Sequence, residues 1–110
     1  MPHDPQMLKG VLALLLLSLL DADDGYGYGI VTRLKAAGFD DLSEGTVYPA
    51  LTRLEGAGYL TSSLVRSGSG PARKYYRTTA TGRDELARRT ASWRALVAAV
   101  DIITTEGAPR

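Results

Sequence analysis

Residues 43–79 read SEGTVYPALTRLEGAGYLTSSLVRSGSGPARKYYRTT, and this stretch decides the fold. Its first third predicts a helix, because apolar residues recur there at helical spacing, namely Val47, Ala50, Leu51 and Leu54. Ser43 stands where the helix begins and can accept a hydrogen bond from a free backbone amide of the first turn. Gly56 and Gly58 are expected to end the helix.

A proline, Pro49, lies inside this helix. Proline lacks the amide hydrogen, and its ring usually costs about 3 kcal/mol in a helix interior. Either the helix breaks at Pro49, or the proline lies early enough for a kink to be tolerated. The apolar spacing continues smoothly to Leu54, which favours the second interpretation.

The rest of the stretch predicts a β-hairpin. Residues 59–66 and 73–79 have the composition of two strands, joined by the flexible turn Ser-Gly-Ser-Gly-Pro at 67–71. Tyr75 and Tyr76 favour a pleated surface, and we expect one of them to pack between the hairpin and the core. Arginine and lysine flank the tip, so the hairpin is basic.

Upstream of this stretch, residues 11–20 are apolar except for Ser18. A membrane-spanning helix needs about 20 apolar residues, and no signal-peptide cleavage pattern follows the run. The run therefore predicts a buried helix that is apolar nearly all round. Because so small a domain can hardly cover such a helix alone, the run also predicts a dimer.

Two further helices complete the chain. An acidic, glycine-rich turn at 21–29 leads into a helix over about 26–37, with Tyr28 in the core and Gly38 at its end. Thr79 looks like the cap of a long final helix over about 80–105. Its apolar stripe suits a coiled-coil-like seam with a partner helix and consists of Leu86, Trp93, Leu96, Val97, Val100 and Ile103.

Composition excludes several classes of function. The chain has 110 residues, enough for one small domain, and its 45% hydrophobic and 23% charged residues are typical of globular proteins. It has no cysteine, which excludes disulfides, thiolate metal sites and a cysteine nucleophile. Its one histidine, His3, lies near the N-terminus, so histidine catalysis and multi-histidine metal sites have no support. We expect no metal, no cofactor and no enzymatic activity.

Charge is uneven along the chain. Residues 1–42 carry three basic and six acidic side chains, whereas residues 43–79 carry five basic and two acidic ones. A basic segment within a nearly neutral domain points to a polyanionic partner, although a plain solvated surface is the simpler alternative.

The predicted order of elements is helix, helix, helix, hairpin, helix. This order predicts a mostly α fold with a small β-hairpin: a winged helix-turn-helix plus a long C-terminal dimerisation helix. We assign residues 1–79 to a winged helix-turn-helix DNA-binding domain and residues 80–110 to the dimerisation helix and tail. In such folds the third helix enters the DNA major groove, and we expect the hairpin, or wing, to reach the flanking backbone or minor groove.

The candidate DNA contacts are polar residues of the third helix and the wing, with one tyrosine before the second helix. Hydroxyl groups and arginine suit base edges and phosphates, and the wing cations suit phosphates. The carboxylate of Glu44 repels phosphate, so it either accepts from cytosine or only caps the helix. The alternative for the whole set is a plain solvent face. The set is Tyr26, Ser43, Glu44, Gly45, Thr46, Tyr48, Pro49, Thr52, Arg53, Arg66, Arg73 and Lys74.

Taken in order, the motifs resemble the PadR family of transcriptional regulators. LKGVLALL at 8–15 resembles the opening helix of that family, and GYGYGI at 25–30 is similar to its HGYGYEI-like segment. SEGTVYPALTRLE at 43–55 matches the family's recognition helix, including the internal Tyr-Pro. RKYYRTTATGR at 73–83 is similar to the return strand of the wing, with Thr78 in place of a usual leucine, which is expected to loosen the packing. The resemblance covers roughly residues 7–100.

This resemblance implies a cytoplasmic, homodimeric repressor that binds a pseudo-palindromic operator in double-stranded DNA. In some members of the family an aromatic residue on the C-terminal helix lines a ligand pocket at the dimer interface, and Trp93 lies where such a residue would be. An apolar or aromatic small molecule is therefore a candidate effector, although Trp93 could instead only pack in the dimer seam. The candidate residues for the effector site and dimer interface are Leu8, Leu12, Leu15, Trp93, Leu96, Val97 and Val100.

A different class of function also fits a winged helix. The chain could be a protein-interaction module without DNA affinity, which would use its apolar helices to join a partner. The basic wing and the hydroxyl-rich face of the third helix argue against it. No membrane partner is expected.

Overall fold

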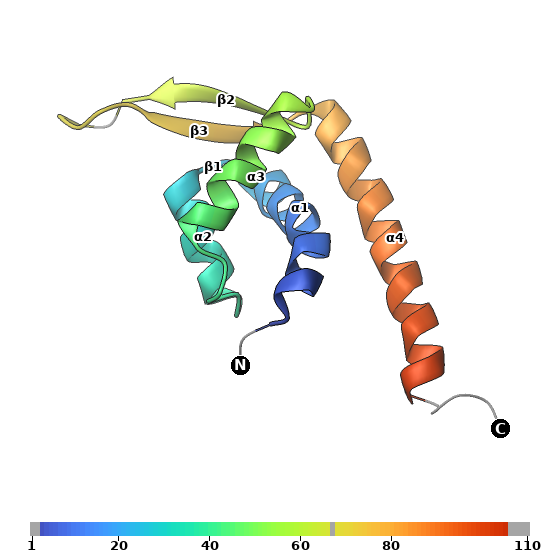
Figure 1. Cartoon of the computed structure of the whole chain (residues 1–110). Coiled ribbons are helices and arrows are strands. Elements are labelled where there is room, and N and C mark those ends of the chain that lie inside the picture. Colours follow the sequence, from blue (N-terminus) through green and yellow to red (C-terminus); the bar gives the residue numbers. More distant parts are fainter. Residues whose placement is uncertain (1–2, 67, 106–110) are drawn as a thin grey trace.

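The computed structural model describes residues 3–66 and 68–105. Its elements follow the order α1 (Pro5–Ala22), β1 (Gly25–Tyr26), α2 (Gly27–Ala36), α3 (Glu44–Gly56), β2 (Leu60–Val65), β3 (Arg73–Thr78) and α4 (Ala80–Thr105). The first three helices pack together beneath the β2–β3 hairpin, and α4 leads away from them (Figure 1). The predicted fold class, a winged helix-turn-helix with a long C-terminal helix, is confirmed.

Polar groups at both ends of α1 fix where this helix begins and ends. The carboxylate of Asp4 accepts hydrogen bonds from the amides of Gln6 at 2.8 Å and Met7 at 3.3 Å. At the other end, the guanidinium of Arg33 donates to the carbonyl of Leu19 at 2.6 Å and to that of Asp23 at 3.1 Å. A cation is favourable at a helix C-terminus, so Arg33 fastens the turn between α1 and α2.

The apolar run of α1 forms the centre of the core, as predicted. Leu16 and Leu17 have no exposed area, and Leu20 is almost as fully buried. Among the described residues, α1 alone has the length and apolar composition of a membrane-spanning helix. One face of α1 is buried in the core, and apolar residues on its other sides, such as Val11, Leu14 and Leu15, stay partly exposed. The core residues are Leu8, Leu12, Leu16, Leu17, Leu20, Ile30, Val31, Leu34, Leu42, Val47, Ala50, Leu51, Leu54, Leu60 and Tyr76.

The structure confirms the apolar stripe expected for α2 and corrects the placement of one tyrosine. Ile30, Val31 and Leu34 are buried, as their spacing predicts, and Gly27 joins them on the inward face. Tyr28 was expected in the core, but it is 62% exposed. Gly27 lies so close to the ring of Tyr48 on α3 that any added Cβ would collide with it. The close helix crossing therefore takes place at a glycine, and the neighbouring tyrosine turns outward.

Helix α3 runs without a break through Pro49, as the apolar spacing predicted. Proline deprives the carbonyl of Gly45 of its usual donor, but this turn is exposed and water can replace the donor. Ser43 occupies the N-cap position, yet its side chain makes no capping hydrogen bond, contrary to expectation. Its backbone carbonyl accepts from Thr46 at 3.0 Å and Val47 at 2.9 Å instead.

The sheet has three antiparallel strands in the order β1-β3-β2. Strands β2 and β3 form the predicted hairpin, with Leu60 opposite Thr78 and Val65 opposite Arg73. Strand β1 was not predicted; it pairs Gly25 with Tyr76 and thereby joins the wing to the start of α2. Tyr76 is buried, which confirms that a wing tyrosine packs against the core.

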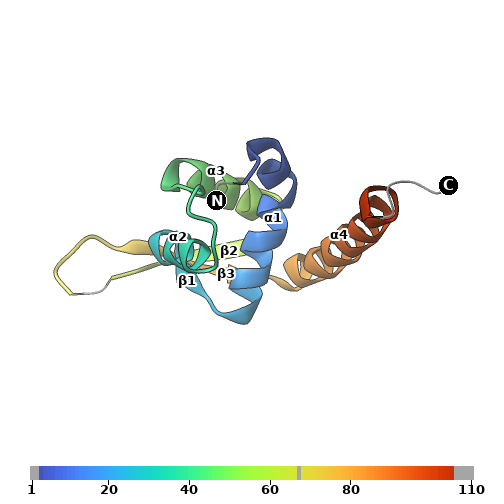
Figure 2. The ribbon, with the colours of Figure 1, turned by 90° about the horizontal axis from the view of Figure 1, so that it is seen from below.

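Helix α4 begins at a threonine cap, as predicted. The hydroxyl oxygen of Thr79 accepts from the amide of Gly82 at 2.9 Å. The rest of the described chain covers little of α4. Within this helix, Gly82 and Glu85 are the only buried residues. The helix and the wing tip extend from opposite ends of the body (Figure 2). Most of α4 therefore presents its side chains to the surroundings.

Candidate nucleic-acid interface

Helix α3 divides its residues between two faces. The inward face consists of the four predicted apolar residues Val47, Ala50, Leu51 and Leu54. All the α3 residues proposed to contact DNA, together with the preceding Ser43, lie on the exposed side: Ser43, Glu44, Gly45, Thr46, Tyr48, Pro49, Thr52 and Arg53. With 13 residues, α3 is about 20 Å long, and a helix fits the major groove, which is about 12 Å wide. Contact of these side chains with DNA stays a prediction.

A hollow lies between the start of α2, the outer face of α3 and strand β3. Five predicted contact residues meet there, from three separate segments: Tyr26, Tyr48, Thr52, Arg73 and Lys74. Gly27, Tyr28 and Tyr76 complete the lining of this hollow. Sequence analysis proposed the five residues separately, and the fold gathers them on one side of the body. We call this surface the α2–α3–wing hollow.

Two features of the hollow bear on anion binding. Burial, followed by the charge of Glu44 and a side-chain hydrogen bond with it, raises the pKa of Tyr48. The phenol is a hydrogen-bond donor, and the carboxylate of Glu44 competes with an anion for it. Helix α2 starts at the same place, with Tyr26 at its N-cap position and no side-chain cap. The first-turn amides of a helix have no partners within that helix, and the helix dipole is positive there. Tyr48, Arg73 and the first residues of α2 thus line one concave surface.

The three predicted wing cations have different surroundings. Arg66 donates from Nη1 to the carbonyl of Gly70 at 3.2 Å, across the tip. Lys74 forms an ion pair with Glu55 of α3, with 3.4 Å between Nζ and Oε1. Arg73 is exposed, and among residues 3–66 and 68–105 it has no carboxylate within ion-pairing distance. Arg73 is therefore the wing cation best placed to meet a phosphate.

Glu55 was missed by sequence analysis. Its second carboxylate oxygen accepts a hydrogen bond from the hydroxyl of Ser62 at 2.6 Å. This bond, followed by the contact with Lys74, lowers the pKa of Glu55 below its ordinary value of 4.5. No periodic pattern could reveal the contact, because it joins a helix to two strands.

The α1 members of the predicted effector and dimer set lie at different depths. Leu8 and Leu12 are only 8% and 5% exposed and belong to the core of the protomer, while Leu15 is half-buried. The α1 residues that share a cavity with Trp93 in this single chain are Gly10, Val11 and Leu14. A role of Leu8, Leu12 and Leu15 in an effector site or dimer interface stays a prediction.

The α4 members of that set do lie at the surface. Trp93 is 43% exposed, Leu96 57% and Val100 46%, whereas Val97 is half-buried. Ile103 continues the exposed apolar stripe towards the end of the helix, whereas Ile102 is exposed on the opposite side of it. Their role in a dimer stays a prediction.

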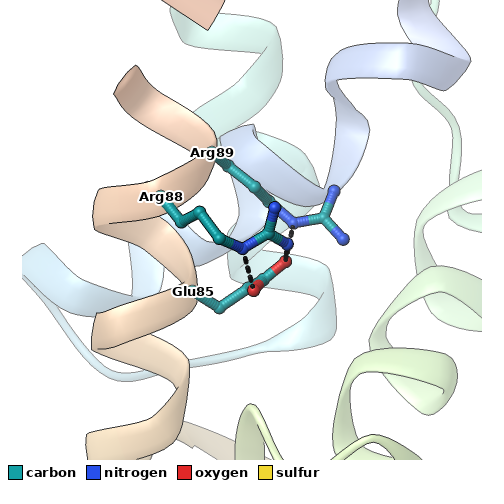
Figure 3. A network of polar contacts seen from close by, with 3 residues as sticks. All are labelled: Glu85, Arg88 and Arg89. Atoms are coloured by element: carbon teal, nitrogen blue, oxygen red, sulfur yellow. Dashed lines mark hydrogen bonds and ion pairs between the residues drawn. The ribbon is translucent and has the colours of Figure 1, made fainter. Parts of the chain in front are cut away.

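A charged cluster near the start of α4 was also missed (Figure 3). Glu85 is buried, and its carboxylate accepts from Nε of Arg88 at 3.1 Å and from Nε of Arg89 at 2.6 Å. The hydrogen bond from Arg88 is the main reason that the pKa of Glu85 is lowered. The spacing of three and four residues along a helix was the available signal. Within the described ranges, no group of three or more metal-ligating side chains occurs.

Comparison with known proteins places the chain among regulators of transcription. The model of a family described as "Transcriptional regulator PadR-like family" matches residues 16–88. A search of curated proteins gave no match.

Solved structures give the same result. A PadR-like transcriptional regulator from Bacillus cereus is 38% identical, with 87% of this chain and 93% of that chain covered and a TM-score of 0.78. A PadR family regulator from Eggerthella lenta is also 38% identical, with coverages of 86% and 82% and a TM-score of 0.80. Bacillus subtilis PadR in complex with operator DNA is 29% identical, with coverages of 71% and 45% and a TM-score of 0.66.

Proposed function

This chain belongs to the PadR-like family of transcriptional regulators, and on that premise we propose that it is a homodimeric repressor that binds double-stranded DNA sequence-specifically. One observation carries the proposal: the outer face of α3 and the α2–α3–wing hollow lie on the same side of the body. Hydroxyl, phenol and guanidinium groups occur together on that side. The operator-bound Bacillus subtilis relative supports DNA as the ligand.

In this proposal α3 enters the major groove and its exposed side chains meet base edges. Thr46, Thr52 and Arg53 supply hydroxyl and guanidinium groups, and Glu44 accepts from the amino group of a cytosine. The hollow holds the adjacent phosphates, with Tyr48 and Arg73 as donors. The wing carries Arg66 to the flanking backbone.

A second copy of the chain covers the exposed stripe of α4. Contiguous apolar surface of this kind marks an interaction site, and a two-fold interface lets the same stripe serve both copies. Two recognition helices related in this way would read half-sites about 10 bp apart in a pseudo-palindromic operator. Occupation of a promoter would repress it, and the protein would act in the cytoplasm, where its DNA lies.

An apolar or aromatic small molecule is the candidate effector. The cavity of about 310 Å³ beside Trp93 supports this, because Val11, Leu14 and Leu96 give it apolar walls. A ligand there would lie between the body and α4. It would thereby change the distance between the two recognition helices.

Fluorescence anisotropy tests the DNA-binding claim. The probes are the duplex upstream of the protein's own gene and a scrambled duplex of equal length, each titrated across a salt series. We expect tight binding to the first duplex only, and a fall in affinity with salt that reflects several phosphate contacts. Arg73→Ala should reduce the salt slope by about 1, whereas Lys35→Ala, at the far end of α2, should leave it unchanged.

Absence of binding to either duplex at low salt would contradict the proposal. The alternative would then be a winged helix that recruits a protein partner through its apolar helix surface.

A second experiment tests the dependence of DNA binding on pairing. Leu96→Asp or Val100→Asp places a charge in the exposed stripe and should abolish both the dimer and the affinity for DNA. An intact dimer of these variants in analytical ultracentrifugation would contradict this part of the proposal.

A further inference from the structure

Glu55 lies in the last turn of α3, where the helix passes into the wing, and its carboxylate contacts both strands of the wing. One oxygen accepts from the hydroxyl of Ser62 on β2 at 2.6 Å, and the other is 3.4 Å from Nζ of Lys74 on β3. Ser62 lies opposite Tyr76, and Lys74 lies opposite Leu64. Since facing residues share a side of a sheet, Ser62 and Lys74 are diagonal neighbours on one face of the hairpin.

This contact begins where the apolar attachment of the wing ends. On the same face of the hairpin, the pairs Leu60–Thr78 and Ser62–Tyr76 contribute three buried side chains. The next pair, Leu64–Lys74, is exposed. Beyond Tyr75, where the pairing with β1 ends, the wing is a two-stranded ribbon, which has little stability by itself. The Glu55 carboxylate is thus the outermost described link between α3 and the wing on this face.

The energetic character of the contact is mixed. An exposed lysine–glutamate pair adds little by itself, and the Lys74 side chain is 52% exposed. The hydrogen bond from Ser62 is short, partly buried and made to a charged acceptor, which makes it the stronger link. The pKa of Glu55 is lowered, so the link is charged at neutral pH.

A carboxylate at this place works against affinity for a polyanion. Lys74 and Thr52 line the α2–α3–wing hollow, and Glu55 neutralises the positive charge of Lys74 there. Its presence is explained if it orders the wing before DNA arrives, because a pre-ordered wing loses less conformational freedom on binding.

We infer that Glu55 is a positioning residue for DNA recognition, which holds the wing at a fixed angle to α3 and so favours the specific duplex over others. This inference rests on the proposed DNA-binding function. It makes Ser62 the partner of Glu55 in specificity, although Ser62 itself carries no charge to attract DNA.

The two possible roles of Glu55 predict opposite results. If Glu55 only neutralises Lys74, its removal frees a lysine and tightens binding to every duplex alike. If Glu55 positions the wing, its removal weakens binding to the specific duplex relative to a scrambled one. The ratio of the two affinities therefore separates the roles.

The experiment uses the full-length protein and two probes: the tightest duplex that the wild type selects from a random-sequence library, and a scrambled duplex of equal length. Glu55→Ala removes both contacts, and Ser62→Ala removes the shorter one without a change of charge. We expect each variant to lower the specificity ratio roughly fivefold to tenfold, the scale of one typical intramolecular hydrogen bond. Thermal unfolding and gel filtration show whether each variant is folded and dimeric.

Two further variants serve as comparisons. Asp40→Asn removes one exposed negative charge from the loop before α3 and should leave the ratio unchanged. Glu55→Gln retains an acceptor for Ser62 but loses the ion pair, and its ratio should fall between those of the wild type and Glu55→Ala. If Glu55→Ala does not fold, Ser62→Ala decides the test.

Tighter binding of Glu55→Ala to both duplexes with an unchanged ratio would overturn the inference, as would an unchanged ratio for Ser62→Ala. If the wild type itself prefers no duplex, the proposed function fails and the inference falls with it. Because the wild type is measured first, the two failures are distinguished.

Discussion

The winged body and the outer half of α4 differ in how far their apolar side chains are buried. In the body, Leu16 and Leu51 have no exposed area. From residue 93 onward in α4, Trp93 is 43% exposed, Leu96 57% and Ile103 64%. Both regions are regular helices with apolar residues at helical spacing. The body therefore completes its core with its own chain, whereas the outer half of α4 leaves its apolar side chains exposed in the single chain.

The same comparison bears on the reason for expecting a dimer. The apolar run of α1 suggested that the domain could not cover this helix alone. In the structure five leucines of α1 are buried, while Val11, Leu14 and Leu15 stay partly exposed. Helix α1 thus retains apolar surface, and the exposed stripe of α4 adds a second reason to expect another copy of the chain.

The largest effect on stability is expected when one leucine of each region is replaced by alanine. Leu51→Ala should leave a cavity in the body and lower the free energy of unfolding by about 2–5 kcal/mol at any protein concentration. Leu96→Ala leaves no cavity in the single chain, so it should act mainly through the dimer. Urea unfolding at several protein concentrations measures both. An equal, concentration-independent loss for the two variants would contradict the comparison.

The next largest effect on stability is expected at the start of α4, where this helix meets the body. A Cβ on Gly82 would collide with the backbone carbonyl oxygen of Tyr59, which cannot move as a side chain does. Gly82→Ala should therefore displace the start of α4 and cost about 1–3 kcal/mol of stability. Gly56 has open space around it, and Gly56→Ala is the matched control, expected to be neutral or stabilising. Equal thermal stability of the two variants would contradict this account.

A smaller effect of opposite sign is expected at Thr78, on the buried end of the wing. Its side-chain oxygen is buried, and among the described residues it has no hydrogen-bond partner. Thr78→Val keeps the shape of the side chain and removes the unpaired group, so it should stabilise the fold by about 1 kcal/mol. A loss of stability in urea unfolding would show that the hydroxyl group has a partner after all. The expectation that Thr78 loosens the strand thus gains a physical cause.

The smallest effect concerns the pH dependence of the covered part of α4. Arg88 and Arg89 lower the pKa of Glu85 below its ordinary value of 4.5. A carboxyl group with a lowered pKa adds stability that is present above the ordinary value and is lost as the pH falls through the lower, folded-state value. The melting temperature of the wild type should therefore exceed that of Glu85→Gln at neutral pH, and the difference should vanish in acid. Asp84→Asn controls for the loss of one charge, and a pH-independent difference for Glu85→Gln would contradict the assignment.

Repeating patterns made most of the fold predictable. The inward residues of α3, its passage through Pro49 and the cap at Thr79 each follow from local spacing or from a side chain near its own helix end. The division of α3 into an apolar and a polar face also fixed which of its side chains could reach a ligand. These features depend on neighbours in sequence, and sequence analysis could therefore find them.

The missed features depend on distant neighbours. Strand β1 has two residues, too few for any alternation, and exists through its pairing with Tyr76 and Tyr75. Tyr28 is an exception, because helical spacing from Ile30, Val31 and Leu34 already places it outside the inward face of α2. The contacts of Arg33 with the end of α1 and of Glu55 with the wing likewise join different elements. The spacing of residues within one segment does not indicate such contacts between different elements.

The central claim is that a second copy of the chain covers the exposed stripe of α4. Sedimentation velocity of the wild-type protein tests it most directly, with Val100→Asp as the matched variant. We predict a particle of twice the chain mass of 11.8 kDa for the wild type and a single chain for the variant, with the helical circular dichroism of the body retained. A wild-type particle of one chain, at concentrations where it binds its selected duplex, would contradict the claim.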